Sequence, residues 1–506
     1  MNDKPKSKWY WRLLRWGLIC LAVLITLAAV LVTEEDWRGK RAWENYKQEA
    51  EARGEHLDWL ADATNTVPDN QNFAKAPIIA NLNVQAGDEA TGTWKFYPYR
   101  NDGGPDKGYG NWGQARLTDL AVWQDYYRHP KTNSPLDIQF PIAPQPQTPA
   151  ADVLLALSIF DKEVEELRSA SRRPYSSFGM VNANDPEVTS RMLQSLAAMK
   201  RCTQLLNLRA IAELADNQGA KGLDDVELLL RLDDELRQEP TLIAHLVSLA
   251  CTAIQLQSIY EGLAQHCWND AQLAELENAL AAKDFLADYQ KAMRGERAYA
   301  WETLENQRLT RKMEQYVVDG TNNPKIVTIS LRWTPDAYFY QSELAHARVN
   351  EQYCLPLVDL DKRVASPTAL RQAEEAVQAE LKHYNPYKIT ALMMFPAISK
   401  AVEKFAAAQS QTDLALVACA LERHRLAHGG YPDTLEELAP QYIAKLPHDV
   451  INGQPLHYRR TPDGLFVLYS LSWNEKDHGG QVALTKSGAI DRKNSDWVWR
   501  YPANEK

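Results

Sequence analysis

An uninterrupted apolar run from Trp16 to Val32 constrains this chain of 506 residues more than any other feature. Together with Leu13 and Leu14, it approaches the roughly 20 residues that a helix needs to cross a bilayer. The run predicts a transmembrane anchor over residues 16–33. A cleaved signal peptide is the alternative, but the run is long for the apolar region of such a peptide, and no small-residue cleavage site follows it directly.

The charges on the two sides of this run predict its orientation. Five basic residues and one acid precede it, and three acids follow it: Lys4, Lys6, Lys8, Arg12, Arg15 and Asp3 before, and Glu34, Glu35 and Asp36 after. Because cytoplasmic flanks carry the excess of Lys and Arg, residues 1–15 are expected in the cytoplasm and the rest of the chain outside. In a bacterial envelope this describes a single-pass protein of the inner (cytoplasmic) membrane whose bulk is periplasmic.

The composition is that of a globular protein, with 45% hydrophobic and 24% charged residues. A net charge of −10 argues against nucleic acid as a partner, because phosphate binding needs a basic face. Fifteen Trp is a high number, and many fall in the first third and at the extreme C-terminus. Their expected role is to anchor loops onto helices, with exposed aromatic binding platforms as the alternative.

Shifts in composition and periodicity divide the chain into five segments, and the expected fold class is mainly α and multidomain. A cytoplasmic tail and the anchor come first, followed by a charged helix that leads into an irregular segment rich in Trp, Pro and Asn. An irregular α-helical domain of helical hairpins follows, and a small α+β module with a long helix and a short antiparallel sheet ends the chain. The predicted bounds are 1–15, 16–33, 34–150, 151–400 and 401–506.

Two helices of the central domain illustrate the reasoning. Residues 241–263 place Ile243, Val247, Ala250 and Ile254 on one helical face, which is the pattern expected of a core-facing stripe. Residues 222–238 are expected to turn their apolar residues inward and their acids outward as a solvated face. The inward set is Leu223, Val226, Leu230 and Leu236, and the outward set is Asp224, Asp225, Asp233, Asp234 and Glu235.

The C-terminal module has clear local signals. An apolar helical stripe that includes Leu421 ends at His428, and Gly429–Gly430 supplies the left-handed stop that helices favour. Thr434 with Glu437 fits a capping box. Residues 456–458 and 465–471 are expected to be strands joined by the Thr461-Pro462-Asp463-Gly464 turn, in which Pro fixes φ and Gly permits positive φ.

Residues 410–500 resemble the globular domain of the major pseudopilin of type II secretion systems. The resemblance rests on a helix running into Gly429-Gly430-Tyr431-Pro432, followed by Leu446-Pro447-His448-Asp449, Leu456-His457-Tyr458, Tyr469-Ser470-Leu471 and Asp477-His478-Gly479-Gly480. It implies an assembly or binding role rather than catalysis. It also implies a calcium ion in the last loop, at positions near Asn474, Asp477 and Asp496. In this chain some 370 residues separate the anchor from the module, and Val450 stands where the family has Pro.

The residues themselves support one site. The loop from Asn474 to Gly480 is rich in the hard oxygen donors that calcium prefers, and plain turn chemistry is the alternative. His424 and His428 are four apart on a helix, but Arg425 stands where the metalloprotease pattern needs Glu, so structural roles are expected. No P-loop or G-x-S-x-G motif occurs.

The sequence therefore favours a non-enzymatic, membrane-anchored envelope protein that has a protein partner and a scaffold or protein-interaction role, with secretion or pilus assembly as the process that the resemblance implies. The alternative is an exported hydrolase whose site lies between the helical domain and the C-terminal module. An enzyme should show a pocket with convergent polar groups of shifted pKa, whereas a binding protein should show a groove or an exposed apolar patch.

Overall fold

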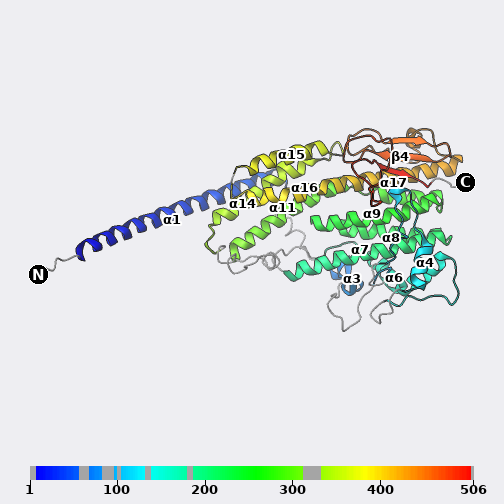
Figure 1. The fold of residues 1–506 in the computed structure, drawn as a ribbon, viewed down its shortest axis with the longest axis horizontal. Helices are drawn as coiled ribbons and strands as arrows, with labels where there is room; N and C mark the ends of the chain where they lie inside the picture. Colours follow the sequence, from blue (N-terminus) through cyan, green and yellow to red (C-terminus); the bar gives the residue numbers. More distant parts are fainter. Residues whose placement is uncertain are drawn as a thin grey trace. The chain divides into compact units, whose positions relative to one another are not determined.

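The computed structural model describes residues 7–55, 68–82, 96–99, 104–130, 138–178, 186–311, 332–383 and 385–502. The mainly α-helical class predicted from the sequence is confirmed, with short antiparallel strands in two small sheets near the C-terminus (Figure 1). The chain forms two compact units, neither of which is continuous in sequence. Unit 1 comprises residues 1–60, 297–351 and 377–395, and unit 2 comprises residues 61–296, 352–376 and 396–506.

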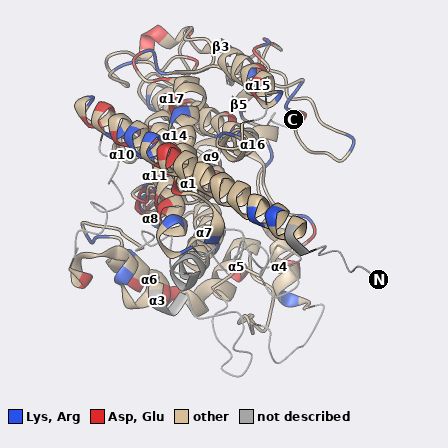
Figure 2. Cartoon of the chain, turned by 90° about the vertical axis from the view of Figure 1, so that its left-hand side faces the viewer, with Lys and Arg blue, Asp and Glu red and all other residues tan. Residues whose placement is uncertain are grey.

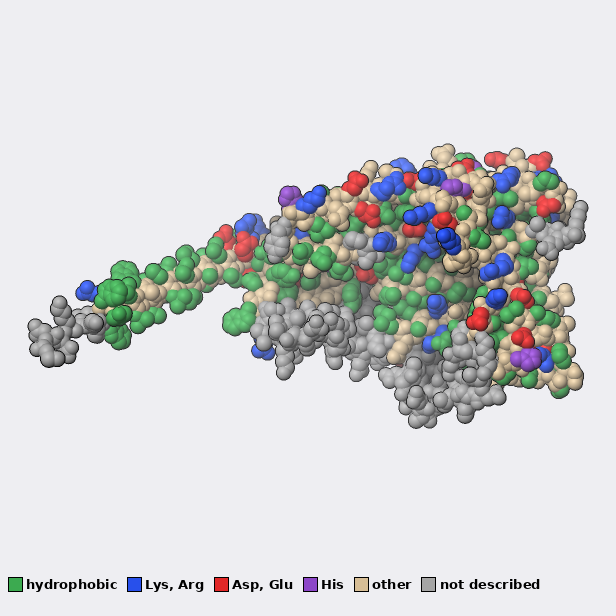
Figure 3. Space-filling model, viewed as in Figure 1, with side chains coloured by type: hydrophobic (Ala, Val, Ile, Leu, Met, Phe, Trp, Pro, Cys, Tyr) green, Lys and Arg blue, Asp and Glu red, His purple; other side chains and the backbone are tan. Residues whose placement is uncertain are grey.

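Unit 1 is built on the long helix α1, Ser7–Ala52. The described side chains from Trp9 to Thr33 are exposed, and hydrophobic side chains cover this part of the helix (Figure 3). Basic residues near its N-terminus and charged residues beyond the apolar stretch are separated by a run without charge (Figure 2). The helix is long and apolar enough to cross a membrane and is a candidate anchor.

Beyond the apolar stretch, α1 packs along α14, Asp336–Val349. Trp43, Tyr46 and Ala50 are buried there, with Tyr340 and Leu344 on the facing helix. The sequence of residues 318–360 breaks the helical pattern and favours a strand or an extended crossing, yet α14 is a helix within this range. The part of this range up to residue 331 lies outside the described residues.

Unit 2 is a layered helical array that carries the C-terminal sheet (Figure 1). The helices α7, α8 and α9 pack on one another, and α17 packs on α9 and α10. The helices with residues in this unit are α3 (Pro77–Leu82), α4 (Leu120–Arg128), α5 (Pro149–Leu157), α6 (Asp161–Ala170), α7 (Pro186–Ala215), α8 (Gly219–Arg237), α9 (Leu242–Ala264), α10 (Asp270–Ala281), α11 (Phe285–Thr310), α15 (Pro367–Leu381), α16 (Ile389–Ser399) and α17 (Ala401–His428); α11, α15 and α16 also have residues in unit 1.

The strands of unit 2 form two antiparallel sheets. One pairs β1 (Val358–Asp359) with β2 (Val364–Ala365), and the other has the order β3 (His457–Arg460), β4 (Phe466–Ser470), β5 (Trp497–Arg500). The β3–β4 hairpin matches the predicted turn, with Gly464 at φ 82°, whereas β5 was not predicted from the sequence. Helix α17 ends as predicted, with Gly429 in the left-handed conformation at φ 77°.

One hydrophobic core joins the helical array to the C-terminal strands. It includes Leu256 and Tyr260 of α9, Leu276 of α10, Leu421 of α17 and Trp499 of β5. All five are buried. The C-terminal segment therefore shares its core with helices that precede it by more than a hundred residues.

The acidic face predicted for α8 is wrong in part. Asp225, Asp233 and Glu235 are at most 5% exposed, although the inward leucines are buried as predicted. Asp225 accepts a hydrogen bond from Arg168 at 2.6 Å, and Asp233 binds the Nζ of Lys283 at 3.0 Å. Asp225 and Asp233 can be buried because each is paired with a basic side chain from a distant segment.

Candidate functional site

A groove in unit 2 is the main candidate site, and its first part is a cavity of about 410 Å³. Side chains of α7 and α9 form one wall, and residues from 98–99, 109–123 and 490–498 complete the lining. Five aromatic residues line this part: Tyr99, Tyr109, Trp112, Trp123 and Trp497. Side-chain amides supply most of its polar groups, from Asn111, Gln204, Asn207, Gln257 and Gln411.

The second part of the groove, of about 300 Å³, lies between α9, α17 and the loop that follows β4. The two parts share Ala253, Gln411 and Trp497 in their linings, so they adjoin. Charged residues occur only in the second part and at Asp496 in the first, among the described residues that line the groove. We call the two parts together the aromatic groove.

The apolar stripe of α9 lies along this groove. Ile254 lines the first part and Ala250 the second, and both are only half-buried, while Ile243 is 39% exposed. The stripe is therefore only partly covered, because Val247 packs against the core whereas Ala250 and Ile254 line the groove. The opposite, more polar face of α9 is the buried one, with His245 at 1% and Gln255 at 2% exposure.

Gln257 holds the aromatic segment against α9. Its Oε1 accepts a hydrogen bond from the backbone N–H of Trp112 at 2.7 Å. Its Nε2 donates to the carbonyl oxygen of Arg116 at 3.1 Å and to Glu261 at 2.8 Å. A Cβ on Gly110 would lie 2.2 Å from this Nε2, so only glycine fits there. Gln257 is thus fully engaged and serves to position the wall rather than to bind a ligand.

Other polar groups in the lining have no partner among the described residues. The indole N–H of Trp123 and the hydroxyl of Ser472 are buried without a hydrogen bond, and each residue is 2% exposed. Trp123 lines the first part of the groove and Ser472 the second. The half-buried amide of Gln411 lies where the two parts meet and makes no hydrogen bond with any described residue. These groups are free to form hydrogen bonds with a ligand or with water.

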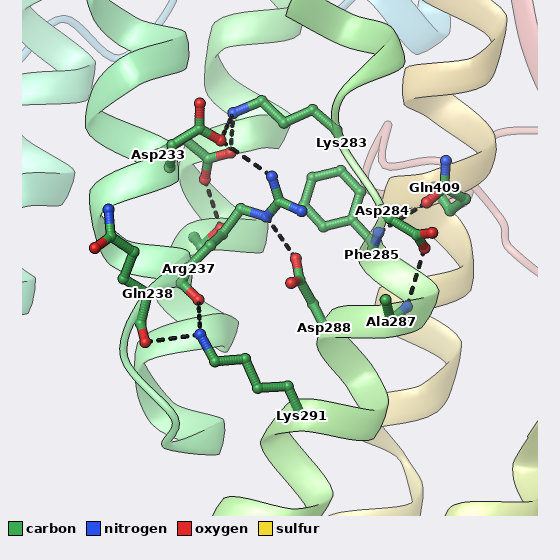
Figure 4. Close-up of polar contacts among 12 residues, drawn as sticks. Asp233, Arg237, Gln238, Lys283, Asp284, Phe285, Ala287, Asp288, Lys291 and Gln409 are labelled. Atoms are coloured by element: carbon green, nitrogen blue, oxygen red, sulfur yellow. Dashed lines mark hydrogen bonds and ion pairs between the residues drawn. The ribbon is translucent and has the colours of Figure 1, made fainter. Parts of the chain in front are cut away.

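A polar network fixes the helix that presents Gln411 (Figure 4). The side chain of Gln409 accepts a hydrogen bond from the backbone N–H of Phe285 at 2.8 Å and donates to Asp413 at 2.9 Å. Arg237 of α8 binds Asp288 of α11 by a short ion pair of 2.5 Å. These buried contacts tie α8, α11 and α17 together.

The predicted calcium residues lie in one loop region. Asp496 is 3% exposed, and its carboxylate accepts hydrogen bonds from the backbone N–H groups of His478 and Gly480. Burial raises the pKa of Asp496 while these two hydrogen bonds oppose the rise. Asp477 accepts a hydrogen bond from Gly479, which lowers the pKa of its carboxyl, and Asn474 bonds Lys476 and Lys493 backbone atoms.

This bonding is turn chemistry, and it occupies oxygens that a cation would need. Among the described residues, no group of three or more His, Cys, Asp or Glu side chains is arranged to hold a metal ion. Calcium binding by Asn474, Asp477 and Asp496 stays a prediction. The residue of the three that lines the groove is Asp496.

His424 and His428 stack with their ring centroids 4.3 Å apart. His424 bonds the carbonyl oxygen of Gly430 at 2.9 Å, and His428 bonds the hydroxyl of Tyr442 at 3.0 Å. Both rings thus connect the end of α17 to the segment after it, which is the structural role expected from the sequence.

Apart from Asp496, Ala250 and Ile254, the residues of the aromatic groove were not singled out in the sequence. The available signal was the high Trp content of the first third and of the C-terminus, because Trp112, Trp123 and Trp497 all line the groove. These segments meet only through the tertiary fold, so sequence spacing alone did not bring them together.

Asp413 provides a test of this buried network through pH. Burial raises the pKa of its carboxyl from 3.8 to about 7. The folded state therefore favours the neutral carboxyl more strongly than the unfolded state does. Its contribution to the free energy of unfolding is fully present below pH 4 and is lost as pH rises toward 7. We expect Asp413→Asn to remove this loss, so that the variant gains up to about 4 kcal/mol relative to wild type between pH 4 and pH 8.

The measurement is the free energy of unfolding in urea at pH values from 4 to 8. Asp463→Asn is the matched control, because Asp463 lies in the exposed β3–β4 turn and its pKa is lowered rather than raised. A wild-type minus Asp413→Asn difference that is constant across this pH range would contradict the assignment.

The structure is thus that of a mainly helical protein with two notable features. One is the apolar N-terminal helix, which is a candidate membrane anchor, and the other is a groove lined by aromatic rings and side-chain amides. Comparison with known proteins adds no family to this description: no family model, no curated protein and no solved structure shows a significant match to the chain.

Proposed function

We propose that this chain is a non-enzymatic, membrane-anchored binding protein whose aromatic groove takes an extended segment of a partner protein. The observation that carries the proposal is the lining of the groove, which combines aromatic rings, an apolar helix face and unpaired neutral polar groups. In this proposal α1 crosses the inner membrane with residues 1–15 in the cytoplasm, and the groove lies outside. A role in secretion or pilus assembly, and the pseudopilin resemblance behind it, stay predictions.

The chemistry of the lining favours a peptide ligand. The amide of Gln411 offers a donor and an acceptor, which complement the C=O and N–H of a peptide unit. Ile254, Ala250 and the surrounding rings offer apolar surface to side chains that alternate along an extended chain. A sugar would present many hydroxyl groups and would need many polar partners in the groove. Gln257 and Asp496, which could serve as such partners, already form hydrogen bonds within the protein.

The hydrolase alternative predicts a nucleophile with an adjacent base in this same place. Ser472 is the candidate hydroxyl, but no His lines either part of the groove among the described residues. Glu403 pairs with Arg492 at 3.7 Å, and the carboxylate of Asp496 is bound by backbone N–H groups. The described lining therefore supports binding better than acid–base catalysis.

Screening the full chain, purified in nanodiscs, against a library of random 12-residue peptides tests the proposal. We expect apolar peptides without a strong charge to bind. Gln411→Leu and Ile254→Asp should each weaken the best peptides at least about tenfold, because one removes a hydrogen-bonding amide and the other places a charge on the apolar wall. Both variants should be compared by circular dichroism to verify folding.

Leu484→Asp is the matched control, since Leu484 is 54% exposed in the C-terminal segment and does not line the groove. Peptide affinities that respond equally to all three substitutions would contradict the groove as the binding site. A glycan array probed with the same variants tests whether the groove binds sugars instead. If only glycans bind, and the groove variants weaken that binding, the peptide proposal is refuted.

A further inference from the structure

The helices α1, α14 and the C-terminal part of α11 are tied together by contacts at both ends of α14. At one end of α14, the backbone N–H of Ala337 donates to Asp36 of α1 at 2.6 Å. At the other end, Tyr46 of α1 donates to Glu351 at 2.8 Å. The α14 helix therefore runs beside α1 in the same direction, away from the apolar stretch, and its first turn is nearest to that stretch.

The C-terminal part of α11 runs the opposite way and ends at the same level. Arg297 binds Glu55 near the far end of α1 at 2.6 Å, whereas Arg308 reaches Asp336 at the start of α14 at 3.6 Å. Arg311 also bonds Asp336 and the carbonyl oxygen of Thr334. The end of α11 and the start of α14 thus lie together beside Asp36.

This paired end exposes large apolar side chains. Trp333 is 84% exposed, which is the highest value among the exposed large hydrophobic side chains of the described residues, and Leu309 is 66% exposed. Arg332 beside them is exposed as well. Single exposed apolar residues are ordinary on protein surfaces, so the position of these two decides their meaning.

The position of these two side chains relative to a membrane follows from how far Asp36 lies from the apolar run of α1. Asp36 follows Val32, the last residue of the apolar run, by four residues, or about 6 Å along a helix. The headgroup layer of a bilayer is about 5–8 Å thick on each side of its hydrocarbon core. Trp333 precedes Asp336 by three residues and is at most about 10 Å from it. Trp333 and Leu309 are therefore within reach of the headgroup layer.

We propose that the paired ends of α11 and α14 seat Leu309 and Trp333 in the interfacial layer of the leaflet from which α1 emerges. The inference rests on the proposed insertion of α1 in a membrane. Trp favours this layer because its ring is apolar and its N–H is polar, and Arg332 adds a cation among the headgroups. The contact of Leu309 and Trp333 with the lipid surface is a second attachment of unit 1, besides α1 itself. The two attachments together fix the angle at which α1 enters the membrane.

A nitroxide label at Arg332→Cys tests the proposal and leaves Leu309 and Trp333 in place. The full chain, with Cys20 and Cys267 replaced by Ala, is placed in nanodiscs of phosphatidylethanolamine and phosphatidylglycerol. The measured quantity is the ratio of relaxation by oxygen to relaxation by a water-soluble nickel chelate. We expect this ratio to be higher for the label at residue 332 than for the same label at Leu484→Cys. Adding Leu309→Ser and Trp333→Ser should raise the access of the chelate several-fold.

A label at Leu24→Cys separates the two ideas. One outcome is that the label at residue 24 lies in the hydrocarbon core while the label at residue 332 is as accessible to the chelate as the Leu484 control. In that case only the interfacial contact is refuted. If Leu24 is itself in water, the anchor fails and the contact fails with it. Nanodiscs of phosphatidylcholine alone should give the same depth, because the contact is apolar; loss of depth there would refute an apolar contact.

Discussion

Leu421→Asp is expected to lower the free energy of unfolding of this protein by about 3–5 kcal/mol. Leu421 is 0% exposed, and its core contains residues from α9, α10 and the C-terminal strands as well as from α17. An aspartate there must either bury an unpaired charge or take up a proton, and it also leaves part of the volume of the leucine unfilled. Urea denaturation of the intact chain measures the effect.

Leu426→Asp is the matched control on the same helix. Leu426 lies five residues further along α17 and is 44% exposed, so the same chemical change should alter stability by no more than about 0.5 kcal/mol. Equal effects of the two substitutions would show that this face of α17 is not core. Because helices of the central array share this core, we also expect Leu421→Asp to lower the stability of unit 2 as a whole.

Lys283→Met is expected to cost about 3–5 kcal/mol, because it leaves a buried carboxylate without its cation. Lys283 is 3% exposed and Asp233 is 1% exposed. The Nζ of Lys283 binds Asp233 at 3.0 Å, Asp234 at 2.6 Å and the carbonyl oxygen of Leu230 at 2.8 Å (Figure 4 shows the surrounding network). Methionine keeps much of the volume and removes all three interactions.

Two further variants make this test specific. Adding Asp233→Asn should recover part of the loss, since the neutral amide needs no cation and can still accept the hydrogen bond from Ser248. Lys362→Met removes an exposed pair with Asp359, whose side chains are 77% and 37% exposed, and should leave the stability close to that of wild type. A Lys283→Met effect as small as that of Lys362→Met would refute the importance of the buried pair.

Local signals predicted local structure well. The Gly429 stop, the Thr434–Glu437 capping box and the turn at Gly464 all appear where the sequence indicated them. Each depends on backbone conformation and on hydrogen bonds within a few residues, so a single sequence contains the necessary information. The apolar stretch of α1 belongs with these, because its length and composition are local properties.

Predictions of which face is buried were less successful. The sequence pattern placed Asp233 outside and Ile254 inside, yet Asp233 is buried beside Lys283 and Ile254 lines the groove. Helical periodicity gives the two faces of a helix but not what each face meets. A buried acid depends on a cation 50 residues away, and an uncovered apolar stripe depends on the shape left between its neighbours.

The sequence by itself determined the candidate anchor, the helical class and the ends of the C-terminal elements, because each is encoded in contiguous residues. Only the tertiary structure decided the aromatic groove and the common end of α11 and α14. Trp112, Gln411 and Trp497 are separated by 299 and 86 residues along the chain, and they line one groove because packing of α9, α17 and the sheet brings their segments together. Such long-range packing is a property of the whole core, and no local pattern specifies it.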